Sequence, residues 1–306
     1  MQLEFNSLIE LNKKLPDEDA ACAHFAALRW KNGEYCLLCG GVEALIHYSD
    51  KRRYRCTQCD GRFSIRYGTI FEDSRLPLRT WFLAIWFISS HKKGIASTQL
   101  AKDLDVTQKT AWFMMHRLRH AARTHSFNRQ LGGTVEVDET FVGGKAKNKH
   151  KDVRGKSGKT GGAGKAIVAG AAERKGPVIA KVVENVQAVT LTEFVREAVA
   201  ANVDLVVTDK WVGYKHLGKE FPHAIVDHAA GEYVRGEAHT NTIEGYWSQL
   251  KRQIFGIHHW VSGKHLGKYV DESAWRFNRR AADEGSRFND FLLGTAGHLT
   301  YKALIA

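Results

Sequence analysis

The order of apolar and polar residues predicts a helical N-terminal part followed by a mixed α/β part. Residues 1–30 have apolar positions at helical spacing, which indicates a short helical lead-in. Residues 76–125 again read as helices and begin with a strongly apolar segment, WFLAIWFISS. From residue 131, β-branched runs such as TVEVDETF, PVIAKVVEN and VDLVVTD predict strands, with amphipathic helices between and after them. This alternation indicates an α/β fold, a mixed sheet with helices on its faces.

The segment between these parts, residues 31–72, is rich in turns and carries a repeated cysteine spacing. Two CxxC pairs are separated by residues 40–55; they consist of Cys36, Cys39, Cys56 and Cys59. Two such pairs can close one tetrahedral Zn²⁺ site, and four thiolates leave no open position, so we expect a structural zinc ribbon. A segment this short needs a metal for its stability. Cys22 has no comparable partner, and we expect it to be a core residue.

Within the helical part, the stretch from Ser97 to Arg119 has the pattern of a helix-turn-helix. A short helix is followed by Asp105-Val-Thr107 and then by a second helix that starts at Gln108. A DNA-binding unit of this kind places the start of its second helix in the major groove. We therefore expect DNA contacts from Gln108, Lys109 and Thr110, and phosphate contacts from Arg117 and Arg119. An ordinary helical hairpin is the alternative.

The charge balance agrees with a nucleic-acid partner. The chain has 45 Lys and Arg against 33 Asp and Glu, a net charge of +12. Such a surplus implies a polyanion, either nucleic acid or a membrane surface. No apolar run approaches the roughly 18 residues that span a bilayer, and the start of the chain does not resemble a signal peptide. We therefore expect a cytoplasmic protein that does not bind membranes.

A second basic feature interrupts the α/β part. Residues 143–165 contain seven Gly, eight Lys or Arg and one Asp, so they cannot form a packed core. We expect a basic loop that contacts DNA phosphates, with Lys145, Lys147 and Lys149 among the contacts.

Three acidic residues stand where a sheet edge can collect them. Asp138 lies near the end of the first predicted strand, Asp209 ends a later one, and Glu244 begins a helix. Strand-end acids of an α/β sheet converge on one edge, and three gathered carboxylates need cations such as Mg²⁺ or Mn²⁺. Two such ions about 3.5–4 Å apart can clamp a phosphodiester. Lys251, two helical turns after Glu244, projects from the same helix face toward DNA, although a solvated helix face is the simpler explanation of this pair.

Two further acids accompany Asp138 on the same strand. Neighbouring side chains on a strand point to opposite faces, so Glu139 should not share the site with Asp138. Glu136 points the same way as Asp138 but lies deeper, and a supporting role is the better expectation for it. His239 precedes the helix of Glu244 and is a weaker candidate for reaching the site.

Three blocks of the sequence carry a family resemblance. VDETFVGG, VVTDKWVGY and HTNTIEGYWSQLKR resemble, in order, the catalytic blocks of DDE transposases of the IS1595 type, also called ISXO2-like, and YVDESAWRFNRR resembles the closing helix of that family. The resemblance implies an RNase H-like catalytic domain over residues 131–290, behind the zinc ribbon, with residues 291–306 left as a C-terminal tail. Many relatives carry Asn in place of the third acid. Asn241 stands three residues before Glu244 here.

The resemblance also implies an activity. Such enzymes cut DNA at the ends of an insertion sequence, and the exposed 3′-hydroxyl attacks target DNA. It makes Asp138, Asp209 and Glu244 ligands of two Mg²⁺ or Mn²⁺ ions and makes Lys251 a residue that steadies DNA, with Arg252 beside it. Paired ends imply a homodimer or higher oligomer on terminal repeats and target DNA.

Three other functions fit parts of the pattern. A metal-dependent nuclease or junction resolvase of the same fold would cut DNA without joining it. A DNA-binding regulator without activity would have lost some of the acids, yet all three are present. An RNA-binding component would show stacking aromatic residues in characteristic strand blocks, and the sequence has none.

Overall fold

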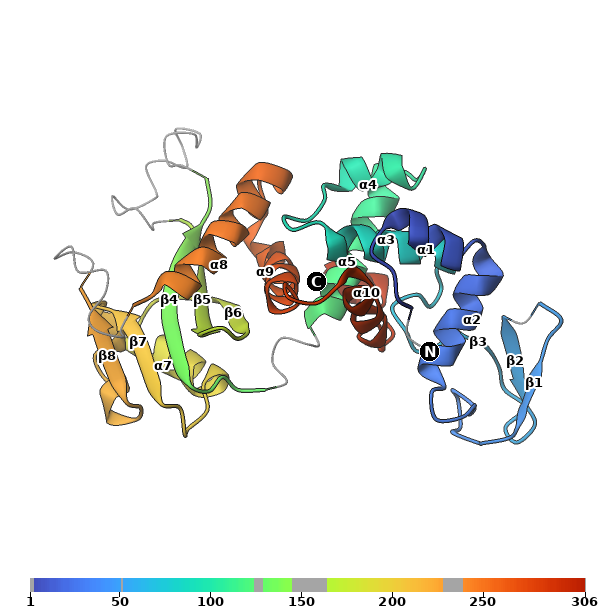
Figure 1. Cartoon of the computed structure of the whole chain (residues 1–306), viewed down its shortest axis with the longest axis horizontal. Helices are drawn as coiled ribbons and strands as arrows, with labels where there is room; N and C mark the ends of the chain where they lie inside the picture. The colour runs from blue at the N-terminus through green and yellow to red at the C-terminus, as the bar shows by residue number, and fades with distance from the viewer. Residues whose placement is uncertain (1–2, 51, 124–128, 145–163, 228–238, 306) are drawn as a thin grey trace. The chain divides into compact units, whose positions relative to one another are not determined.

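The computed structural model describes residues 3–50, 52–123, 129–144, 164–227 and 239–305, and the chain forms two compact units (Figure 1). Unit 1 comprises Met1–Ala122 with Ala281–Ala306, and unit 2 comprises Arg123–Arg280. The expected basic-loop contacts Lys145, Lys147 and Lys149 lie outside the described residues.

The helices of unit 1 start where the sequence supplies caps. Ser7 accepts a hydrogen bond from Glu10 N at the start of α1, and Asp17 accepts one from Ala20 N at the start of α2. The apolar segment becomes α3, and the predicted helix-turn-helix becomes α4 and α5. The helices of this part are α1 (Leu8–Lys14), α2 (Glu18–Arg29), α3 (Leu78–Ser90), α4 (Ser97–Asp103) and α5 (Gln108–Arg123).

The cysteine-rich segment folds as a three-stranded antiparallel sheet in the order β1-β2-β3. Its strands are β1 (Leu45–His47), β2 (Arg53–Cys56) and β3 (Arg62–Ser64). The strands are short, and their buried side is mainly aromatic: Tyr54 stacks on Phe63 and meets the edge of Trp30 from the end of α2.

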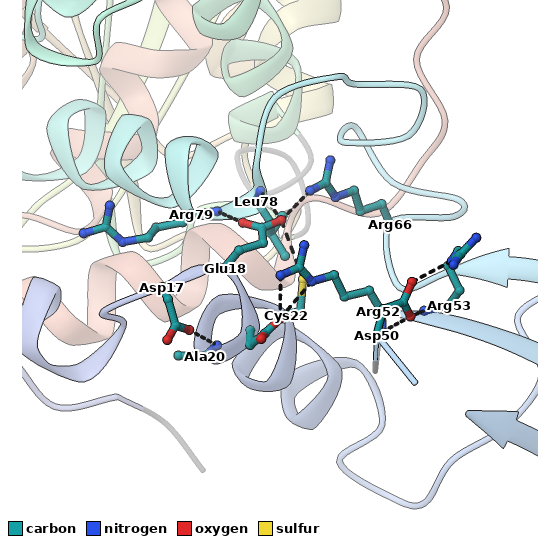
Figure 2. Close-up of polar contacts among 11 residues, drawn as sticks. Asp17, Glu18, Ala20, Cys22, Asp50, Arg52, Arg53, Arg66, Leu78 and Arg79 are labelled. Carbon is teal, nitrogen blue, oxygen red and sulfur yellow. Dashed lines mark hydrogen bonds and ion pairs between the residues drawn. The ribbon is translucent and has the colours of Figure 1, made fainter. Parts of the chain in front are cut away.

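One carboxylate joins the small sheet to the helices of unit 1 (Figure 2). Glu18 on α2 forms an ion pair of 2.6 Å with Arg66, which follows β3. The same carboxylate accepts hydrogen bonds of 2.8 Å from Leu78 N and Arg79 N. Because Pro77, the cap residue of α3, offers no side-chain hydrogen bond, Glu18 satisfies the first amides of α3 from outside that helix.

The C-terminal boundary differs from the expectation that the catalytic domain runs to residue 290 and is followed by a tail. Helix α10 (Glu284–Leu293) belongs to unit 1. Its Phe288 is fully buried, with ring centroids 5.3 Å from Phe5 and 5.5 Å from Phe82. Further along, Ile70 N donates to Thr295 O, and the chain ends with α11 (Tyr301–Ile305). The segment after residue 280 is therefore part of the core of unit 1.

Unit 2 is built on a five-stranded mixed sheet in the order β6-β5-β4-β7-β8. Its first strand, β4, is central: it pairs antiparallel with β5 and parallel with β7. The strands are β4 (Thr134–Val142), β5 (Ala166–Glu173), β6 (Val178–Val183), β7 (Leu205–Asp209) and β8 (His223–Val226). The predicted mixed α/β sheet is confirmed, and this arrangement is consistent with an RNase H-like fold.

Helices cover both faces of the sheet, and side chains of β4 alternate between them. Val135 and Val137 pack in a core with residues of α7 (Ala188–Ala198). Val142, on the other face, packs in a core with residues of α8 (Asn241–Arg252) and α9 (Gly263–Asn278). Even-numbered positions of β4 therefore face α8, and odd-numbered positions face α7.

No helix in the part of the chain that the structure describes has both the length and the apolar character needed to cross a membrane.

Candidate functional site

Three acids from two strands and one helix of unit 2 lie in electrostatic contact where β7 ends. Asp209 is the last residue of β7, whereas Asp138 lies in the middle of β4 and not near its end as expected. Val137 of β4 pairs with Thr208 of β7, so the next residues of these parallel strands, Asp138 and Asp209, are neighbours. Glu244 lies in the first turn of α8, and α8 covers the face of the sheet toward which Asp138 points. Burial raises the pKa of Asp138 to about 6, and repulsion by Asp209 and Glu244 adds to the effect of burial.

Each of these acids has a hydrogen-bond donor that orients it. Trp247 Nε1 donates to Asp138 Oδ2 at 2.9 Å, from the helix that carries Glu244. The backbone N–H of Trp211 donates to Asp209 Oδ1 at 3.1 Å. Thr240 Oγ1 donates to Glu244 Oε1 at 2.9 Å. These donors were not anticipated from the sequence, although the spacing of Trp247 three residues after Glu244 places both on one side of α8.

The chemistry of the donor set suits a hard divalent cation. Carboxylate oxygens are the ligands that Mg²⁺ and Mn²⁺ prefer. Burial first, and then repulsion by Asp209 and Glu244, disfavour the charged form of Asp138, and a bound cation would offset both effects. In a compact ligand set the oxygens of the three acids would all lie within 4.8 Å of one another, and here they do not.

Glu139 points away from these acids, as the alternation predicts. Its Oε2 accepts a hydrogen bond of 2.7 Å from the hydroxyl of Tyr214, on the α7 side of the sheet. Burial raises the pKa of Glu139 to about 7 despite this hydrogen bond. Glu139 is thus held by a tyrosine on the other face of the sheet from Asp138.

Glu136 is completely buried and binds the start of α8. Its carboxylate accepts hydrogen bonds from the backbone N–H groups of Thr242 and Ile243, and it pairs with Arg174 at 3.0 Å. His239 Nδ1 also lies 3.2 Å from Glu136. His239 thus lies against this supporting carboxylate.

Lys251 and Arg252 occupy the last turn of α8, and both are exposed. Glu244 and Lys251 lie in one continuous helix, so the expected two-turn spacing holds. This placement leaves both cationic side chains accessible to a polyanion.

In unit 1, the four cysteines form a compact set. Among the described residues they are the one group of three or more Cys, His, Asp or Glu whose ligand atoms all lie within 4.8 Å. The Sγ atoms of Cys36 and Cys59 are 3.8 Å apart, as are those of Cys39 and Cys56. Sulfur atoms on a tetrahedron with Zn–S bonds of about 2.3 Å lie about 3.8 Å apart, so the set fits one Zn²⁺ ion.

Backbone geometry prepares the cysteines for a metal. Cys36 N donates to Gly41 O at 2.8 Å and Cys56 N donates to Gly61 O at 2.9 Å, which closes each pair into a tight turn. Hydrogen bonds from backbone N–H groups, that of Cys59 first, lower the pKa of Cys56 to about 7. The thiolate is the form that binds a metal.

The structure forms the two helices expected of a helix-turn-helix, α4 and α5, but it corrects the placement of the later arginines of α5. Thr107 Oγ1 accepts a hydrogen bond of 3.2 Å from Thr110 N, and Gln108 and Lys109 are exposed. Arg119, however, is 1% exposed, and the guanidinium of Arg117 donates to the carbonyls of Ile70 and Glu72. Both guanidinium groups serve the interior of unit 1, so neither is placed for the phosphate contact expected of it.

Comparisons with known proteins agree with both units. Residues 130–278 match the ISXO2-like transposase domain, and residues 16–62 match a transposase zinc-ribbon domain. A relative from Halobacterium salinarum, described as an uncharacterized protein in transposable element ISH50, is 31% identical over 278 residues, covering 84% of this chain and 90% of the relative. An uncharacterized transposase-like protein of Haemophilus influenzae is 32% identical over 98 residues, which cover 32% of this chain and 77% of that protein. The chain therefore belongs to the IS1595 family of ISXO2-like transposases.

Proposed function

We propose that this transposase cuts the ends of its insertion sequence and joins the freed 3′-hydroxyl to target DNA, with Asp138, Asp209 and Glu244 as ligands of two divalent cations. One observation carries the proposal: the three acids interact beside the end of β7, and Asp209 and Glu244 help to raise the pKa of Asp138. Bound Mg²⁺ or Mn²⁺ would activate the attacking oxygen and stabilise the leaving oxygen of the phosphodiester.

The chain's own residues prepare this site in two ways. Trp247, Trp211 and Thr240 orient the three carboxylates by the hydrogen bonds described above. Lys251 and Arg252, exposed at the end of α8, would bind DNA phosphates beside the acids.

Unit 1 would recognise the terminal repeats. The exposed start of α5, with Gln108, Lys109 and Thr110, would enter the major groove, and a structural Zn²⁺ held by the four cysteines would stabilise the ribbon. The net charge of +12 favours association with DNA.

The acids can be tested with a charge-neutral variant, Asp209→Asn. We expect cleavage and strand transfer of labelled element ends to fall by at least about 100-fold, because a charged ligand is lost, while affinity for the ends stays within about threefold. Asp204→Asn is the matched control: Asp204 is exposed at the opposite end of β7 and should leave both activities unchanged.

The same assay separates a transposase from a nuclease. Wild-type protein should convert cleaved ends into joined products in the presence of target DNA. Cleavage without any joining would instead support a nuclease or resolvase, and retained strand transfer in Asp209→Asn would remove Asp209 from the site.

A further inference from the structure

Two buried contacts tie helix α8 to strand β4, and together they set the relation between Glu244 and Asp138. Resting on the proposed function, we infer that Glu136 and Trp247 are positioning residues: they hold α8 against β4 so that Asp138 and Glu244 can share a divalent cation. Neither side chain would itself be a ligand of that cation.

The first contact fixes the start of α8 from strand β4, on the sheet face that α8 covers. Glu136 Oε2 accepts hydrogen bonds from Thr242 N at 2.7 Å and Ile243 N at 3.1 Å, while Oε1 accepts one from Thr242 Oγ1 at 3.0 Å. These amides belong to the first turn, immediately before Glu244. Thr240, the cap residue of α8, makes no side-chain cap hydrogen bond to that turn. Glu136 therefore replaces the usual local cap, and a buried carboxylate at a helix N-terminus also suits the helix dipole.

Further donors surround the same carboxylate. Arg174 at the end of β5 donates to Glu136 at 3.0 Å and also to the carbonyl of His239 at 3.1 Å. Glu136 is 0% exposed, so its charge depends on these donors for compensation. The carboxylate thus connects β4, β5 and the chain entering α8.

The second contact fixes the rotation of α8 one turn later. Trp247 donates to Asp138 Oδ2, and its indole ring lies against Gly170 of β5. Gly170 is the residue that pairs with Asp138 in the sheet. A Cβ at position 170 would lie 2.6 Å from the indole ring, which is closer than van der Waals contact allows. The absence of a side chain at Gly170 is what admits the tryptophan to Asp138.

Together the two contacts relate one acid to the other. Glu136 and Asp138 lie two residues apart on one face of β4, and each binds α8, on either side of Glu244. A helix held at two points can neither slide nor rotate without breaking a buried hydrogen bond, which is costly. Glu244 is consequently kept on the side of α8 that faces Asp138.

The test compares three full-length variants. Glu136→Gln keeps the shape of the side chain but removes one acceptor and the charge, and Trp247→Phe keeps an aromatic ring on Gly170 but removes the donor. Glu173→Gln is the matched control, because Glu173 also binds an arginine and a backbone amide, Arg129 and Gly132 N, on the same sheet without contacting α8.

Two measurements are made on each variant. Binding of Mn²⁺ is followed by electron paramagnetic resonance of the remaining free ion, with Asp138→Asn identifying the signal of the acidic site. Hydrogen–deuterium exchange reports on the amides of Thr242 and Ile243. We expect Glu136→Gln and Trp247→Phe to weaken Mn²⁺ binding by about 10- to 100-fold, as loss of groups that orient metal ligands does. Glu136→Gln should also speed amide exchange in the first turn of α8, and Glu173→Gln should do neither.

Each result decides between positioning and a merely structural role. Unchanged Mn²⁺ affinity in folded Glu136→Gln and Trp247→Phe would overturn the inference, even if both variants lose thermal stability. If Glu136→Gln does not fold, Trp247→Phe alone decides through its Mn²⁺ affinity. If the variants bind Mn²⁺ more weakly but the wild-type protein does not cleave DNA, the positioning role stands and the proposed function is overturned. If the wild-type protein cleaves DNA but the variants bind Mn²⁺ as tightly as it does, the proposed function stands and the positioning role is overturned. No saturable Mn²⁺ signal at Asp138 in wild type would overturn both.

Discussion

Three acids of one strand acquire three different surroundings within four residues. Glu136 is fully buried and surrounded by donors, Asp138 faces two other acids, and Glu139 meets a tyrosine on the opposite face. The strand period of two determines which face each acid occupies, and the position along β4 determines whether it meets the start of α8 or the other two acids. Residue type alone would have made the three equivalent.

The raised pKa of Asp138 predicts that this acid lowers stability near neutral pH. A folded-state pKa of about 6, above the ordinary value of 3.8, means that the folded state binds protons more tightly than the unfolded state. The stability associated with the protonated acid is fully present below pH 4 and is lost as the pH rises through 6. At pH 7 the loss is at most about 3 kcal/mol, the free-energy equivalent of a shift of about two units.

Asp138→Asn should therefore be more stable than wild type at pH 7 in buffer without Mg²⁺ or Mn²⁺, and the advantage should disappear near pH 4. Chemical denaturation at pH 4, 5, 6 and 7 measures this difference, and Asp204→Asn serves as the exposed control. An advantage that is constant across these pH values would contradict the electrostatic origin. The same substitution should abolish cleavage, so that function and stability are opposed at this residue.

At the scale of elements, the sequence predicts helices and strands well where local signals specify them. The second helix predicted to start at Gln108, the CxxC turns and the β-branched runs all lie where the structure forms the corresponding elements. The placement of Asp138, Asp209 and Glu244 on two strands and a helix follows from the same local patterns.

Local sequence patterns do not predict contacts between distant segments of the chain. Glu18 supplies the cap of α3 and Glu136 supplies that of α8, each from another element. The burial of Arg119 is equally non-local, because an arginine on an amphipathic helix looks the same in sequence whether it faces solvent or a neighbouring loop. These features depend on tertiary packing, so the residues near them in the sequence do not predict them.

The ribbon provides the prediction at this scale. Its strands have three or four residues each, so we expect that metal binding supplies much of its folding free energy. Cys39→Ser should lower the zinc content below one ion per chain, make residues 31–66 sensitive to protease, and weaken binding to element ends by about tenfold or more. Cys22→Ala removes a thiol outside the cluster and should keep the zinc content of wild type. A full complement of zinc in Cys39→Ser would argue against the four-thiolate site.

At the scale of the whole molecule, the chain visits unit 1 twice. It leaves unit 1 after α5, forms unit 2, and returns to unit 1 with α10. Unit 1 is therefore built from two separate segments of the chain, with unit 2 inserted between them. For this reason unit 2 ends at Arg280 and not at residue 290, where the end of the catalytic domain was expected. Helix α10 has the amphipathic pattern of any surface helix, and nothing in that pattern says which unit it covers.

The return of the chain makes the stability of unit 1 depend on its last residues. Phe288 of α10 is 0% exposed and packs between Phe5 and Phe82, so truncating it leaves a cavity in the core of unit 1. Phe288→Ala should destabilise unit 1 by about 3–5 kcal/mol, while Leu293→Ala, on the same helix but 54% exposed, should have little effect. Hydrogen–deuterium exchange under increasing urea distinguishes the units: amides of α3 should lose protection at lower urea in Phe288→Ala, and amides of β4 and β5 should not. Loss of protection in both units at the same urea concentration would show instead that the whole chain unfolds as one cooperative body.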